Sequence, residues 1–508
     1  MKRREFIQNT VTAGAILPIA SSGMFAKALP YYGLEKAVAS DRILVLINLF
    51  GGNDGLNTVV PFNDPVYISS RKNIGLKKSE VLPISNDLAL HNSLSPFYKM
   101  YNDGNLAVVS NVGYPNHNRS HFRSTDIFNS ASDEDKYETT GWIGRYLENK
   151  YPNFPNVLPD TPYAIQVASA TSLLLQSNKG SMGMALDNPD RLYNLAKGLK
   201  ASTDPVPTTL AGPELSYVRD VISQSNKYSS EINKAMLSGT NSETYGADSL
   251  ASQLRVVARL INGGLNTNIF VVSLSGFDTH TVQLPAQAQL LSYLSNAVNA
   301  FMKDLSTNGN ADRVVCMTYS EFGRRLNENG SQGTDHGAAS PQFVIGKNVL
   351  GGKVIGGAPN LTNLDDRGDV KHTIDFRQIY SSVLEDWLGV SSANSKKLLL
   401  NGSFSKLPLF KAASFHDDTI PSGMTLSNCF PNPVNDKTKI NFNLVQNGYV
   451  AINLFSPDGK KSYGILSKTL QSGEHTVEVD ATYLPAGNYM YILEQNGYKI
   501  TNKMSVVR

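Results

Sequence analysis

Cysteine is scarce in this chain of 508 residues, which contains only Cys316 and Cys429. Two cysteines so far apart cannot build a disulfide framework, which excludes the small cross-linked folds that many secreted proteins use. Cys316 lies inside an apolar run, so we interpret it as a packing residue. Long apolar runs are lacking too, because the most apolar stretch near the N-terminus is too short and too polar to cross a membrane. We therefore expect no transmembrane segment.

An excess of charge of either sign is also missing. Lys and Arg number 46 against 43 Asp and Glu, a formal net charge of +3. The first 28 residues hold four basic residues and one acidic residue, so a chain without them has a net charge near zero. A nucleic-acid partner needs a basic surface, so none is predicted. The glycines of 51–55 do not match G-x-G-x-x-G, which disfavours a dinucleotide-binding fold.

The N-terminus has the pattern of an export signal. A basic start, MKRREFIQNT, is followed by the apolar stretch VTAGAILPIA and by Ala26-Lys27-Ala28, which fits a cleavage site. We therefore expect residues 1–28 to direct export. Arg3-Arg4 is similar to the twin-arginine signal, but Lys2 stands where Ser or Thr is usual, so general secretory export stays open.

Short apolar runs, rich in β-branched residues, predict buried strands at four places. They are Arg42–Phe50, Leu106–Val112, Ile269–Leu274 and Val314–Thr318. Apolar residues at helical spacing lie in Leu88–Tyr101, in 254–261 and in 290–305, and each of these segments precedes one of the strands. Such alternation predicts an α/β domain with a doubly wound, mainly parallel sheet.

Polar side chains follow all four predicted strands, at the edge where such a sheet binds its ligands. Carboxylates and imidazoles in that position predict a divalent metal site, with zinc as the first choice and magnesium or calcium as alternatives. The predicted metal ligands are Asp54, Asp278, His280, Glu321, Asp335 and His336. If the neighbours Asp335 and His336 are considered alone, the alternative to a metal site is that Asp335 caps a turn and His336 is a surface residue.

The chain divides into segments of different composition. We expect the sheet domain to span 41–410, with an inserted helical cap in the Ser/Thr/Asn-rich segment near 197–245. A linker follows over 411–428. Residues 429–508 contain short alternating strands separated by turns such as Pro457-Asp458-Gly459, which predicts a small β-sandwich.

Three segments of this terminal module carry a family resemblance: Pro431-Asn432-Pro433, LFSPDG at 454–459 and LPAGNY at 484–489. With them the module resembles the C-terminal sorting domain of the type IX secretion system of Bacteroidetes. The resemblance implies the type IX machinery as a partner. It also implies passage through the periplasm to the cell surface or the exterior.

The larger domain contains the segments LVLINLFGGNDGLNTVVP, NRSHFRSTDIF, SLSGFDTH, TYSEFGRR, GTDHG and TIDFRQIYSSVLEDWLG. In these it resembles a family of exported proteins of unknown function, placed among the sulfatase-like members of the alkaline phosphatase superfamily. Asp335-His336-Gly337 looks like the superfamily's Asp-His-Gly metal motif, and Asp54 looks like its first metal aspartate. Asp278 with His280 looks like its Asp/His ligand pair, although the two residues are closer together here.

The same resemblance implies a nucleophile at a helix N-terminus, where backbone N–H groups stabilise developing negative charge. Ser120 fits by order and position, with a plain helix-capping role as the alternative. His121 is a second catalytic candidate, and Arg119 and Arg123 would grip an anionic ester. Arg324 would bind substrate or form an internal ion pair. The Cys-x-Pro-Ser-Arg signature is absent from the sequence, which excludes a formylglycine mechanism.

Two functions are compatible with these patterns. The first is a secreted, metal-dependent hydrolase that acts on phosphate or sulfate esters, with a small anionic ester or a glycan-derived molecule as substrate. The second is a catalytically inactive binding protein, displayed at the cell surface on the same fold. Bound metal is the property that separates them.

Overall fold

The computed structural model describes residues 42–155, 159–189, 192, 194, 226–411, 423–456, 462–495 and 498–508. The expected export signal lies outside these residues, as do most of the expected 197–245 insertion and most of the expected linker. Contacts divide the described chain into two compact units, one that ends at Lys411 and one that holds the residues from Gly423 onward. Each unit is described by itself.

The first unit is built on a nine-stranded sheet. All neighbouring strands in it are parallel except β12, which is antiparallel to both of its neighbours. The strand order is β13 (Lys353–Ile355), β5 (Leu106–Gly113), β12 (Ser340–Ile345), β11 (Val314–Tyr319), β1 (Ile43–Phe50), β10 (Ile269–Ser275), β6 (Ala164–Gln166) and β9 (Met184–Ala185), with β14 (Ile374–Asp375) beside β5. This architecture confirms the predicted mainly parallel α/β sheet and all four predicted strands.

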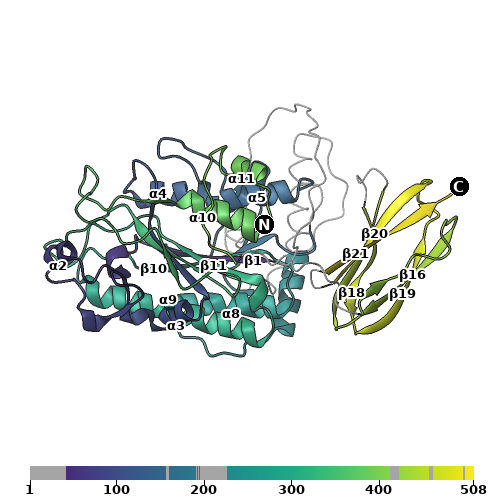
Figure 1. Cartoon of the computed structure of the whole chain (residues 1–508), viewed down its shortest axis with the longest axis horizontal. Helices are drawn as coiled ribbons and strands as arrows, with labels where there is room; N and C mark the ends of the chain where they lie inside the picture. The colour runs from purple at the N-terminus through teal and green to yellow at the C-terminus, as the bar shows by residue number, and fades with distance from the viewer. Residues whose placement is uncertain are drawn as a thin grey trace, which may run out of the picture. The chain divides into compact units, whose positions relative to one another are not determined.

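Helices cover both faces of the sheet (Figure 1). One face packs against α3 (Ser95–Asn102), α8 (Ser249–Asn262) and α9 (Gln283–Thr307), and the other against α4 (His121–Ser130), α5 (Trp142–Lys150), α10 (Phe376–Ser382) and α11 (Ser392–Leu398). An apolar core lies on each face of the sheet, and the central strand β1 contributes side chains to both, because its alternate side chains point to opposite faces. Ile43 and Val45 lie in the core with α8 and α9, whereas Leu44 and Leu46 lie in the core with α4 and α5. Burial on both faces explains why this strand is an unbroken apolar run.

The segment Leu88–Tyr101 is helical only in its second half, so the sequence-based expectation was partly wrong. Ala89–His91 forms β4, which pairs with β2 (Val59–Val60) and β3 (Val81–Pro83). The backbone hydrogen bonds to these two strands outweigh the local helical spacing. Among the described residues, no helix is long and apolar enough to cross a membrane.

The second unit is a sandwich of two antiparallel sheets around one apolar core. Side chains of Ile440, Ile452 and Tyr491 meet in this core, each from a different strand. One sheet contains β15 (Thr425–Leu426), β16 (Lys437–Leu444) and β19 (Gly473–Asp480); the other contains β18 (Ser462–Leu470), β17 (Gly448–Phe455), β20 (Gly487–Gln495) and β21 (Tyr498–Val506). The predicted small β-sandwich is confirmed.

Candidate metal centre

The candidate site lies where the carboxyl ends of β1, β10 and β11 meet the N-terminus of α4. Asp278 and His280 follow β10, Glu321 and His336 follow β11, and His121 is the first residue of α4. Gly51, directly after β1, has φ +122°, and a Cβ there would collide with the backbone nitrogen of Asp278. The glycine is therefore needed for the close approach of the carboxyl ends of β1 and β10.

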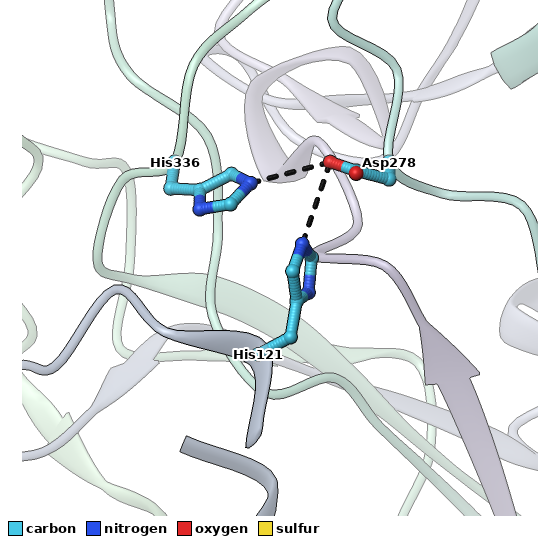
Figure 2. Close-up of side chains that lie close together, drawn as sticks. All are labelled: His121, Asp278 and His336. Carbon is cyan, nitrogen blue, oxygen red and sulfur yellow. Dashed lines mark hydrogen bonds and ion pairs between the residues drawn. The ribbon is translucent and has the colours of Figure 1, made fainter. Parts of the chain in front are cut away.

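One carboxylate oxygen is the meeting point of three imidazoles. Oδ1 of Asp278 is 3.0 Å from Nε2 of His280, 3.2 Å from Nε2 of His336 and 3.5 Å from Nε2 of His121. Figure 2 shows the rings of His121 and His336 directed at this carboxylate. The Nε2 atoms of His280 and His336 are 3.0 Å apart. We call these four side chains the donor group.

Each of the three histidines contacts an oxygen atom through Nδ1, the ring nitrogen on the side away from Asp278. Nδ1 of His121 is 2.8 Å from Oε1 of Glu321, and Nδ1 of His280 is 3.2 Å from Oδ1 of Asp335. Nδ1 of His336 is 2.8 Å from the backbone carbonyl of Arg119. Because a carboxylate and a carbonyl can only accept, a proton on each Nδ1 has an acceptor there, which leaves each Nε2 able to bind a metal ion.

This arrangement fits a bound cation. Three imidazole nitrogens and one carboxylate oxygen gathered around one point are donor types that bind zinc. Donors that bind zinc at about 2.0–2.1 Å in a tetrahedron are about 3.3 Å apart. The ligand atoms of His121, Asp278 and His336 all lie within 4.8 Å of one another, and Nε2 of His280 is 3.0 Å from both Oδ1 of Asp278 and Nε2 of His336. Histidines with a carboxylate or carbonyl on the far nitrogen are the usual pattern around a protein-bound metal.

The charges around the donor group hold Asp278 ionised. Burial by itself raises the pKa of this carboxyl, but Arg324, His336 and His280 together lower the pKa to about 2. Arg324 donates to the carboxylate over 2.6 Å. The hydrogen bond to Glu321 raises the pKa of His121, whereas burial lowers the pKa of His336.

Comparison with known families separates the two units. A model of the family described as "Protein of unknown function (DUF1501)" matches residues 41–399. The chain belongs to this family. A second model, described as "Secretion system C-terminal sorting domain", matches residues 428–507. The DUF1501 region thus carries the donor group, and the tail is a sorting domain for secretion.

Solved structures similar to this DUF1501 chain share little sequence with it. A protein of the alkaline phosphatase superfamily from Vibrio parahaemolyticus has 8% identity and a TM-score of 0.34, over 93% of this chain and 91% of its own. A phosphonate monoester hydrolase from Silicibacter pomeroyi has 8% identity and a TM-score of 0.32, over 91% and 89%. A sulfatase from a Pseudoalteromonas species has 10% identity and a TM-score of 0.30, over 87% of this chain and 84% of its own. Similarities of this size do not establish an activity. No curated protein matches the chain significantly.

The predicted metal ligands occupy three different positions in the DUF1501 domain. Asp278, His280 and His336 belong to the donor group. Glu321 and Asp335 lie behind it, each bonded to a histidine of the group. Sequence reasoning proposed His121 as a catalytic residue and not as a ligand, and its position directly after the helix N-cap was the one local sign of its importance.

Asp54, the remaining predicted ligand, is directed elsewhere. Its side chain is fully buried, and its Oδ2 is 2.5 Å from Nη1 of Arg71 and also accepts from the amide of Gln283. Its Oδ1 accepts from the backbone nitrogen of Leu56 and caps a short helical turn, η1 (Gly55–Asn57). A cationic side chain thus neutralises this carboxylate. Nothing in the polar segment around Arg71 indicated this partner beforehand.

Ser120 occupies the N-cap position of α4 without using its hydroxyl as a cap. The side chain is exposed, and its hydroxyl has no hydrogen-bond partner in the part of the chain that the structure describes. It is next to both His121 and Arg119, whose backbone carbonyl holds His336. The hydroxyl is therefore free at a helix N-terminus beside the donor group.

The three arginines that the sequence suggested for substrate are engaged inside the protein. The guanidinium of Arg119 pairs with Asp365 at 2.7 Å and with Asp369. Arg123 donates to the backbone carbonyls of residues 133, 134 and 136. Arg324 is buried and donates to the carbonyls of residues 51, 52, 277 and 334 as well as to Asp278. Arg324 is thus the one of the three whose guanidinium contacts the donor group.

Proposed function

We propose that this protein is a metal-dependent hydrolase of phosphate or sulfate esters, exported by type IX secretion and active at the cell surface or outside the cell. One observation carries the proposal: three imidazoles, each fixed through Nδ1, turn Nε2 toward one ionised carboxylate. The sorting domain supports the export route. The N-terminal residues 1–28 remain a sequence-based proposal for the first export signal, by the twin-arginine or the general secretory route.

The donor group would hold the metal with His121, Asp278, His280 and His336. Three nitrogen donors favour zinc over magnesium or calcium, because those two harder ions prefer oxygen ligands. A divalent ion held there would act as a Lewis acid toward an ester oxygen. Glu321 and Asp335 keep two of the imidazoles oriented and raise their basicity as ligands.

Ser120 is the proposed nucleophile. Its free hydroxyl lies at the N-terminus of α4, where unpaired backbone N–H groups and the helix dipole favour an anionic ester. The guanidinium groups of Arg119 and Arg123 are occupied by carboxylates and by backbone carbonyls respectively, which leaves the binding of the anion to the helix N-terminus and the metal. Arg119 contributes through its backbone, because its carbonyl orients His336.

The test combines metal analysis with a substrate panel. The full chain, purified without chelator, is expected to contain about one zinc ion per chain and to hydrolyse at least one of a set of aryl phosphate, phosphonate and sulfate esters. His280→Ala is expected to lower both the metal content and the turnover. A protein with bound metal but no turnover on any ester would favour the inactive binding protein. A protein without metal would remove the basis of both the site and the hydrolase.

A further inference from the structure

A cavity of about 190 Å³ lies between α4 and the carboxyl ends of β1, β10 and β11. None of the described side chains that line it carries a charge at neutral pH, and burial raises the pKa of the one phenol among them. Its polar lining consists of amides and hydroxyls: Asn48, Thr125, Asn129, Gln166, Ser172, Ser273, Ser275 and Tyr319. The cavity has the volume of about six water molecules in the liquid, which suits one small ring.

Three of these side chains form a row across the sheet. Asn48 of β1 is in register with Ser273 of β10 on one side and with Tyr319 of β11 on the other. On the same face of β1, Leu44 and Leu46 are packed in the apolar core. The face therefore changes from apolar to polar at Asn48, where the cavity begins.

Asn48 is an unusual residue for this strand, because it interrupts the apolar run ILVLINLF. A polar side chain in such a place costs stability unless it has a hydrogen-bond partner. Within the described residues, the amide of Asn48 has none, and the buried hydroxyl of Thr125 has none either. The half-buried amide of Asn48 thus remains available to a ligand, and the buried hydroxyl of Thr125 lies beside the cavity without a partner.

The cavity adjoins the donor group. Thr125 is one helical turn beyond His121 on α4, so the two side chains lie on the same face of the helix. Phe50 lines the cavity, and its ring centroid is 5.8 Å from that of His121. A molecule whose anionic end is bound at the donor group can therefore extend its other end into the cavity.

We propose that this cavity is the subsite for the alcohol part of the ester, and that it takes a neutral, hydroxyl-rich ring, a single monosaccharide unit. That the ligand is an ester rests on the proposed function, whereas the sugar subsite rests on the side chains that line the cavity. Amides and hydroxyls can both donate to and accept from sugar hydroxyls, whereas the uncharged lining offers no opposite charge to an ionic group. An aromatic alcohol would leave the amide of Asn48 unpaired, so the site discriminates against it.

The first experiment measures binding without turnover. Saturation-transfer NMR with neutral monosaccharides is run on the full chain, on Asn48→Leu, on Thr125→Val and on the control Asn296→Leu, an exposed position of α9. We expect the unmodified chain and the control to bind alike, and the two cavity variants to bind about tenfold more weakly. Thr125→Val keeps the side-chain shape and removes a hydroxyl without a described partner, so it stays folded even if Asn48→Leu does not. Equal binding by all four proteins overturns the proposal.

The second experiment compares esters. If the subsite is correct, Asn48→Leu lowers the ratio of kcat/KM for a sugar ester to that for an aryl ester by about tenfold. Hydrolysis of aryl esters by a chain that binds no neutral sugar overturns the subsite and leaves the proposed function standing. Sugar binding that depends on Asn48, in a chain without metal or turnover, supports the subsite and overturns the proposed function.

Discussion

If the donor group binds a metal ion, a chelator should lower the thermal stability of the unit that contains it. A metal that binds only the folded state, present at about a thousand times its Kd, stabilises that state by about 4 kcal/mol. The unit that ends at Lys411 has about 370 residues, and an unfolding entropy of about 2.1 cal/mol/K per residue gives about 0.8 kcal/mol/K for it. We therefore expect a chelator to lower the Tm of this unit by about 5 °C.

A double variant assigns that shift to the donor group. Asp335→Ala with His336→Ala removes one imidazole and the acceptor that orients His280, so two of the four donors are affected. The chelator should then change the Tm by less than about 1 °C, because little metal remains to be removed. His372→Ala, at a half-buried histidine outside the donor group, should keep the full shift of about 5 °C.

The assay is differential scanning calorimetry of each protein with and without EDTA, together with metal analysis by mass spectrometry. Each protein is compared with itself, so any intrinsic cost of the substitutions cancels. A Tm that does not respond to chelator in the unmodified chain, with no metal bound, would falsify the shared metal site. An equal shift in the double variant would move the metal to other residues.

Three further predictions concern single residues and the tail. Ser120→Ala should abolish ester turnover while the metal content stays unchanged, because removal of a nucleophile removes no ligand; turnover that survives would assign the attack to another group. Arg71→Met should cost about 3–5 kcal/mol in urea unfolding, since it leaves the buried Asp54 carboxylate without its cation, and should not change the metal content. A change of metal content in that variant would connect Asp54 to the metal site. Deletion of 429–508 should leave the first unit folded but retained in the periplasm, which cell fractionation and surface protease treatment can measure; surface display of the shortened chain would contradict this.

The sequence by itself determined the sheet and the general place of the site. Short apolar runs rich in β-branched residues have few alternatives to burial within a parallel sheet, so the strands around Ile47, Val109, Val272 and Cys316 could be assigned from local pattern. The carboxyl ends of parallel strands share one edge of the sheet. Polar residues that follow different strands were therefore expected to meet, as Asp278 and His336 do.

Only the tertiary structure decided which of these residues face one another. Asp54 and Asp278 are both aspartates that follow a central strand, yet one carboxylate lies against Arg71 and the other against three imidazoles. The direction of each side chain depends on partners from distant segments, such as Glu321 behind His121. Local periodicity contains no information about such contacts. For the same reason the strand at Ala89–His91 was not foreseen, because its hydrogen bonds go to two other segments of the chain.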